Sequence, residues 1–263
     1  MNKEHILKMY LKGLRYDGRK LLEYRPVLIE SNISAMAEGS ARVKIGETEV
    51  LAGVKLAIEA PYPDTPDQGK LAVNAELMAL SNPEFEPGPP GEQAIELARV
   101  VDRSIRESKM IDMAKLCITP GEKVWAVMID ICTINDAGNL LDAAALASIV
   151  ALKNTRFPKV DENGVIQYDV KTEKHMPLLK IPIEVTVLKI GDYFIVDPTT
   201  EEEKNIDARL TVALSDDDHI CAMQKGGDVP LSIEEIGNMV DIAIKKTAEL
   251  RKKLAGEEAN AKK

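Results

Sequence analysis

Residues 138–154, GNLLDAAALASIVALKN, follow closely on the apolar stretch KVWAVMIDICTI at residues 123–134. A glycine turn between a β-rich run and a run of small apolar residues predicts a strand, a tight turn and a helix pressed on a sheet. Backbone N–H groups at such a helix start commonly bind a phosphate. Here the tip holds Asn139, two leucines and Asp142, and Asp142 takes the anionic position of the first turn. The stretch alone favours a packed helix, because no arginine is present to clamp a phosphate.

The composition excludes several classes of protein. The chain has 263 residues with 45% hydrophobic side chains, so a sizeable core can form, and its formal net charge is −9. This acidic balance argues against a broad basic surface for nucleic acid, although a small local basic patch remains possible. No apolar run approaches the roughly 20 residues of a membrane helix, and the charged N-terminal stretch lacks the apolar block of a signal peptide. We therefore expect no contact with a membrane.

The cysteines and histidines are scattered and match no ligand set for zinc or for a pair of metal ions. We expect buried free thiols in a reducing, cytoplasmic setting, histidines at the surface, and no metal or other cofactor. These residues are Cys117, Cys132, Cys221, His5, His175 and His219.

Strand and helix signals predict an α+β protein made of two sheet-plus-helix halves, residues 1–155 and 156–263. In the first half we expect a short amphipathic helix at residues 4–14 and a hairpin around Gly46–Glu47. The remaining elements of this half are a strand at residues 70–80, a helix at 91–108 after a proline-glycine loop, a strand pair around Pro120–Gly121 and a helix that begins near residue 140.

The second half repeats this outline. Asn163–Gly164 marks a turn between two short strands. A long helix follows Ser232, which forms a capping box with Glu235, and it reaches about residue 254 before a solvated tail. Four further strand candidates lie between them, at residues 178–190, 192–198, 208–214 and 219–226.

A stripe of arginines on the helix after the proline-glycine loop is the first candidate site. Arg99, Arg103 and Arg106 fall within a narrow arc, because residues i, i+4 and i+7 are stacked neighbours. Such a stripe could hold phosphates of a nucleic-acid strand. Alternatively it is a solvated face in which Asp102 pairs with Arg106, and Glu107 pairs with Arg103 in the same way. Composition alone favours the solvated face.

A group of carboxylates in DPTTEEEKNIDARL, residues 197–210, is the second candidate. Glu201, Glu202, Glu203 and Asp207 fall within seven residues, and clustered acids can bind Mg²⁺ or transfer protons. A run of three glutamates is more typical of a solvated turn, which is the interpretation we favour. Neither candidate, nor the helix start, makes a working site by its own residues.

Together these stretches resemble the RNase PH family. RYDGRKLLEYRP (15–26) resembles its opening R-x-D-G-R…R-P element, and GSARVKIGETEVLAGV (39–54) resembles its first hairpin. PGPPGEQAIELARVVDRSIRES (87–108) resembles the PGP loop and the helix after it. NDAGNLLDAAALAS (135–148) resembles the phosphate-binding turn, and VDPTTEEEKNIDARLTVAL (196–214) the acidic catalytic strand pair. The resemblance runs from about residue 15 to the last helix and implies the RNase PH fold.

Departures from the family pattern fall on the residues that active members use. Paired arginines after PGP are replaced by PGEQ at residues 90–93, and the Ser/Thr–Arg pair of the phosphate turn by Asn139 and Leu140. Asp207 survives without its Asp-x-Pro context, and Glu203 matches the upstream catalytic aspartate. Phosphorolysis needs an orthophosphate held in line by positive charge. The resemblance therefore implies a chain without catalytic residues.

The same departures resemble the non-catalytic RNase PH-like subunits of the archaeal exosome. This resemblance implies a hexameric ring, a trimer of heterodimers with an active RNase PH-like subunit, and RNA-binding cap proteins on one face. Single-stranded RNA in the central channel would be phosphorolysed from its 3′ end. It also implies RNA-backbone contacts from Arg99, Arg103 and Arg106. Two alternatives remain, an autonomous phosphorolytic 3′–5′ exoribonuclease that uses Asp207, and an architectural protein that never touches RNA.

Overall fold

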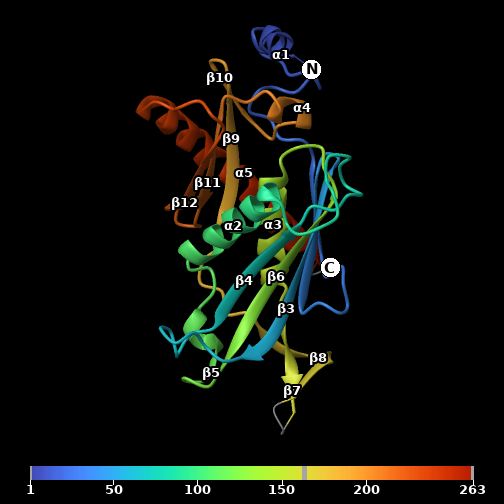
Figure 1. The fold of residues 1–263 in the computed structure, drawn as a ribbon, viewed down its shortest axis with the longest axis vertical. Helices are drawn as coiled ribbons and strands as arrows, with labels where there is room; N and C mark the ends of the chain where they lie inside the picture. Colours follow the sequence, from blue (N-terminus) through green and yellow to red (C-terminus); the bar gives the residue numbers. More distant parts are fainter. Residues whose placement is uncertain (1, 162–164, 262–263) are drawn as a thin grey trace.

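The long strand β6 (Lys123–Asn135) runs through the middle of the larger sheet in the computed structural model, which describes residues 2–161 and 165–261 (Figure 1). β6 pairs antiparallel with one neighbour and parallel with the other. Alternate residues of β3 are buried, as expected for a strand with one face on the core. The other strands of this sheet are β1 (Val27–Ser31), β2 (Gly39–Ile45), β3 (Thr48–Glu59), β4 (Lys70–Glu76) and β5 (Cys117–Thr119), in the order β1-β2-β3-β6-β4 with β5 on β6.

The second half contributes an antiparallel sheet and a separate ribbon. The predicted turn at Asn163–Gly164 lies outside the described residues, but the two strands beside it form the ribbon β7–β8, at the end of the molecule opposite α1 (Figure 1). The sheet has the order β10-β9-β11-β12. Bounds are β7 (Arg156–Val160), β8 (Ile166–His175), β9 (Ile183–Ile190), β10 (Tyr193–Val196), β11 (Ala208–Leu214) and β12 (Ile220–Gly226).

One hydrophobic core joins the two sheets, because helices pack between them. The small-residue helix α3 is buried almost all round and contacts β2, β3 and β9. α2 packs on β4, α3 and β12, and α5 packs on β9, β11 and β1. The helices are α1 (Lys3–Tyr10), α2 (Glu92–Glu107), a 3₁₀ turn (Met113–Leu116), α3 (Leu140–Lys153), α4 (Thr200–Glu203) and α5 (Ile233–Ala261).

The predicted α+β architecture of sheets backed by helices is confirmed, and so are the hairpin at Gly46 and the capping box, in which Glu235 N–H donates to Ser232 Oγ at 3.2 Å. The division into residues 1–155 and 156–263 stays a prediction. α5 continues to Ala261 where a solvated tail was expected, since the segment after residue 254 is rich in good helix formers.

The first helix is shorter than predicted. α1 ends at Tyr10, and Leu11 and Leu14 are 75% and 42% exposed instead of lying on a buried side. Ile6 and Tyr10 are buried in the apolar cluster on β9 and β10, and the partly buried Leu7 packs against it. Gly13, with φ of +72°, then turns the chain out of the helix, because glycine adopts this left-handed conformation without strain.

Candidate functional site

The arginines of the N-terminal segment form a structural clamp. Arg15 is fully buried, binds Glu202 with Nε at 2.9 Å, and donates to two backbone carbonyl oxygens. Arg19 Nη1 and Arg25 Nη2 both donate to the buried carboxylate of Asp197, at 2.8 and 2.7 Å. Arg25 also donates to carbonyl oxygens of the turn before α3. These cations are neutralised within the chain and hold the N-terminal segment against the second half.

The turn before α3 holds a carboxylate where an anion site was considered. Asn139 has φ of +64° and is 1% exposed, and its backbone N–H donates to Glu203 Oε1 at 2.8 Å. A Cβ on Gly138 would lie 2.4 Å from the carbonyl oxygen of Pro198, so the turn and the segment before α4 fit closely only with glycine there. The anion position at the start of α3 is therefore filled by the protein's own Glu203.

Asp142 lies in the first turn of α3, as predicted, but its carboxylate binds groups other than the backbone N–H groups of that turn. Its side chain is buried beneath the helix start and accepts from Tyr24 OH at 2.6 Å, from the Thr186 backbone N–H at 2.8 Å and from Asn139 Nδ2 at 3.1 Å. Burial raises the pKa of Asp142 to about 7 against the effect of these three donors. Asp142 thus joins α3 to β9 and to the N-terminal segment.

A cavity of about 230 Å³ lies in front of this turn, between the start of α2, the start of α3 and β9. Its charged lining residues are Glu96, Asp136, Glu203 and Arg209, and Arg209 is already ion-paired with Glu96. Burial raises the pKa of Glu203 to about 7, the nearby charge of Asp136 adds to this, and the Asn139 N–H opposes it. The described residues that line the cavity therefore carry an excess of negative charge, and their one cation, Arg209, is not free to bind an orthophosphate.

The four carboxylates of the second candidate do not converge. Glu202 is buried against Arg15 and also forms a capping box with Thr199, so α4 is a short helix and the predicted solvated turn is wrong for Glu202. Asp207 lies outside the cavity, where Lys3 Nζ and the Gly191 N–H bind its carboxylate. Burial opposes these contacts, yet they hold the pKa of Asp207 below its ordinary value.

No group of three or more potential ligands that could hold a metal ion occurs among the described residues. The three cysteines are free, as predicted, but half-buried instead of buried. No helix in the described part of the chain is long and apolar enough to cross a membrane.

The arginine stripe of α2 is not uniform. Arg99 is exposed and has no hydrogen bond or ion pair with any described residue. Arg106 binds Asp102 at 2.7 Å, as predicted, and also donates to the Leu71 carbonyl oxygen at 3.3 Å. Arg103 does not pair with Glu107. Its Nη1 donates instead to Gln224 Oε1 of β12 at 3.2 Å, a contact between the two halves that the helical spacing could not predict.

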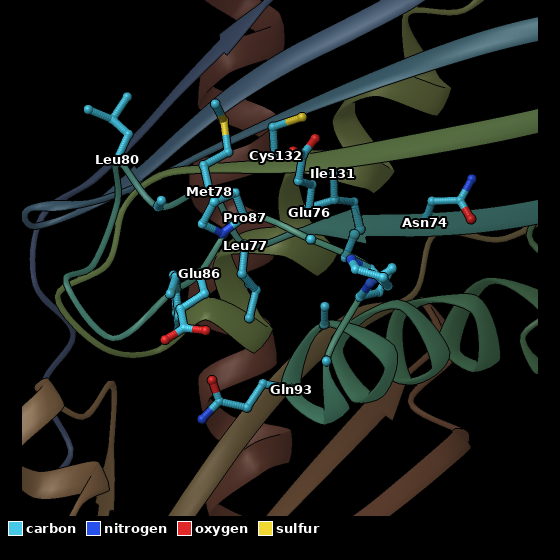
Figure 2. A pocket seen from close by; sticks show the side chains of 18 of the residues that line it. Asn74, Glu76, Leu77, Met78, Leu80, Glu86, Pro87, Gln93, Ile131 and Cys132 are labelled. Carbon is cyan, nitrogen blue, oxygen red and sulfur yellow. The ribbon is translucent and has the colours of Figure 1, made fainter.

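A groove of about 1,160 Å³ lies beside the proline-glycine loop, between the end of β4 and the start of α2 (Figure 2). Its floor is apolar, with Leu77 and Met78 near its centre. Its charged lining residues are all acidic, including Glu76 and Glu86 (Figure 2). This groove repels a phosphodiester backbone, whereas α2 beside it carries the exposed Arg99.

Glu203 was the residue whose role the sequence did not reveal. The only local signal was the Thr-x-x-Glu spacing at residues 199–202, which predicts a helix start and would have turned the acidic run inward.

Comparisons with known proteins agree with this geometry. The 3′ exoribonuclease family matches with its domain 1 at residues 23–158 and its domain 2 at residues 180–246. The Exosome complex component Rrp42 of Sulfurisphaera tokodaii is 48% identical over 90% of this chain and 86% of its own length. The protein of that name in Methanosarcina acetivorans is 45% identical over 95% of this chain and 92% of its own.

The chain is also similar to chains of solved archaeal exosome structures. A chain of the Archaeoglobus fulgidus exosome with RNA bound to the active site has a TM-score of 0.89 and 46% identity, covering 96% of this chain and 97% of that one. A chain of an archaeal exosome core has a TM-score of 0.84 and 43% identity, covering 95% of both.

Proposed function

The chain belongs to the RNase PH family of 3′ exoribonucleases, and on that premise we propose that it is a catalytically silent subunit of an archaeal exosome core. Relatives named as exosome components over most of their length support the assignment to that complex. In this proposal the chain forms heterodimers with an active RNase PH-like subunit, and three heterodimers close a hexameric ring. Cap proteins bind one face, RNA enters the central channel, and the active partner degrades it from the 3′ end with orthophosphate.

The observation that carries the proposal is the hydrogen bond that the Asn139 backbone N–H donates to the Glu203 carboxylate. An orthophosphate at the start of α3 would have to displace this carboxylate or lie beside it. At an effective dielectric constant of about 20, two like unit charges roughly 5 Å apart repel by about 3 kcal/mol. This repulsion applies to the ionised form of Glu203, which predominates above its pKa of about 7. Arg209 could offset this repulsion only by breaking its ion pair with Glu96, and the charge of Asp136 adds to the repulsion. Without bound phosphate there is no nucleophile for phosphorolysis.

The contribution of this subunit to RNA degradation is a set of backbone contacts from α2, at Arg99, Arg103 and Arg106. The exposed guanidinium of Arg99 and the absence of cations from the neighbouring groove support this location. A net charge of −9 is compatible with it, because only the rim of a channel has to be basic. Contacts to phosphates give no sequence preference. A cytoplasmic location is part of the same proposal.

The test compares the purified chain with a co-expressed complex. The chain alone is expected to leave a 3′-labelled RNA intact in phosphate buffer, while the complex has the mass of a hexamer and releases nucleoside diphosphates. Rapid phosphate-dependent decay by the chain alone would overturn the proposal.

The rival function, an autonomous phosphorolytic exoribonuclease, rests on Asp207. Its carboxylate is bound by Lys3 and the Gly191 N–H, away from the cavity. An Asp207→Asn change would abolish activity under the rival, and should leave activity of the ring unchanged under our proposal. The architectural alternative predicts that charge reversal at Arg99 and Arg103 has no effect on RNA binding.

A further inference from the structure

The contact between Arg103 and Gln224 joins α2 to the edge strand of the smaller sheet. Arg103 Nη1 donates to Gln224 Oε1 at 3.2 Å, and Gln224 Nε2 donates to the Lys225 carbonyl oxygen at 3.4 Å. The residues are 121 positions apart in the sequence, and they meet because α2 packs against β12. Gln224, on β12, therefore fixes the direction of the half-buried guanidinium of Arg103, on α2.

The partner of Arg103 differs in charge from the partners of the neighbouring arginines. Arg106 is neutralised by Asp102, and Arg209 by Glu96. Gln224 is a neutral acceptor, which orients a guanidinium without cancelling its charge. Oriented cations with free donors are what bidentate recognition of a phosphate requires.

The crevice below Arg103 contains one acidic side chain among its described lining residues, and that side chain forms no ion pair with Arg103. Glu184 is its acidic lining residue and is 2% exposed, and neither of its carboxyl oxygens has a hydrogen-bond partner among the described residues. Burial and the nearby charge of Asp142 raise the pKa of Glu184 well above its ordinary value, although the charge of Arg209 opposes this. No hydrogen bond or ion pair joins Glu184 to Arg103, so among the described residues it is Gln224 that holds this guanidinium.

We propose that Gln224 is a positioning residue for an RNA-phosphate contact made by Arg103, and that the RNA-binding surface of α2 consists of Arg99 and Arg103. This inference rests on the proposed function, and it reduces the proposed RNA-binding arginines from three to two. Arg106 is excluded because it pairs with Asp102 and joins α2 to the β4 backbone. RNA affinity should then depend on the charge of residue 224, although residue 224 need not touch RNA.

The experiment measures binding of single-stranded RNA to the assembled ring at several salt concentrations, for Gln224→Glu, Arg103→Gln and the double variant. Glutamate at 224 would form an ion pair with Arg103, so Q224E should weaken binding roughly tenfold, about as much as R103Q. Each should reduce the slope of log affinity against log salt by about 0.7, the value for one single-strand phosphate. The double variant should bind no more weakly than R103Q alone.

Gln167→Glu on β8 is the control, because it adds the same charge in the separate ribbon. Equal weakening by Q167E, or additive effects of Q224E and R103Q, would overturn the role of Gln224 while leaving the RNA contact intact. If R103Q itself leaves binding unchanged, the RNA contact of Arg103 in the proposed function fails, and this inference fails with it.

Discussion

Helix α2 and the start of α3 differ in how their charged groups are paired, although each helix follows a glycine-containing turn. At α3 the backbone N–H is bound by Glu203, and the nearby arginines of the N-terminal segment are bound by Asp197. On α2, Arg99 has no partner among the described side chains and Arg103 has a neutral one. Around α3, buried ion pairs stabilise the fold and neutralise the arginines. Nucleic-acid binding instead needs cationic side chains that are not already paired with carboxylates.

The largest expected effect is a loss of folding stability when the structural clamp of the N-terminal segment is broken at Arg15. Arg15→Ala would leave Glu202 buried without its cation, and breaking a buried pair typically costs about 3–5 kcal/mol. Urea unfolding of the isolated chain measures the loss. The matched control is Arg156→Ala, whose ion pair with Glu173 is exposed and should contribute under about 1 kcal/mol. Similar losses for both variants would contradict the structural role of the clamp.

The second prediction concerns pH and the same region. Burial raises the pKa of Asp142 and of Glu203 to about 7, above the values near 4 of an unfolded chain. The stability they contribute is complete below about pH 4 and is lost as the pH rises through about 7. The free energy of unfolding should therefore be lower at pH 8 than at pH 5 for the wild type.

Glu203→Gln sharpens that prediction, because glutamine keeps an acceptor for the Asn139 N–H and cannot ionise. The variant should be more stable than the wild type at pH 8 by on the order of 1–2 kcal/mol and nearly equal at pH 5. Glu234→Gln, on the exposed start of α5, should leave the pH profile unchanged. If the unfolding free energies of E203Q and the wild type change in parallel with pH, Glu203 is not a source of the pH dependence.

The third prediction tests the other side of the comparison. Arg99→Glu with Arg103→Glu should weaken RNA binding by the ring at least tenfold, about 1.4 kcal/mol or more, and make it less dependent on salt. Charge reversal at Arg156 and Lys159 on β7 should change little. Unchanged affinity in the α2 variant, with the ring intact by mass, would favour the architectural alternative.

The smallest effect is expected at Asp207. Asp207→Asn removes an ion pair with Lys3 at the surface of the second half, which should cost at most about 1 kcal/mol in the unfolding free energy. Phosphorolysis by the complete ring should be unaffected. A large loss of activity would show that Asp207 takes part in the reaction.

Local patterns in the sequence predicted most of the strands and helices, but they made the first helix too long and missed α4. The alternating burial of β3, the small residues of α3 and the Ser232–Glu235 capping box are all set by neighbours in the chain. The family resemblance added the prediction that the arginines binding orthophosphate are lost, at residues 90–93 and at the turn before α3. The helix spacing also gave the Asp102–Arg106 pair, because residues four apart are neighbours on one helix.

Contacts between the two halves could not be predicted in this way. Asn139 meets Glu203 across 64 positions, and Arg103 meets Gln224 across 121. Both contacts depend on how the sheets pack, and no local spacing encodes them. The acidic run was taken for a solvated turn because its one local signal, the capping-box spacing of Thr199 and Glu202, was not used.

The most direct test of the central claim is a phosphate titration of the isolated chain, followed by NMR at the backbone amide of Asn139. The account predicts no saturable shift at neutral pH, because Glu203 holds that N–H and the cavity has no free cation. Saturable phosphate binding at this amide would contradict it.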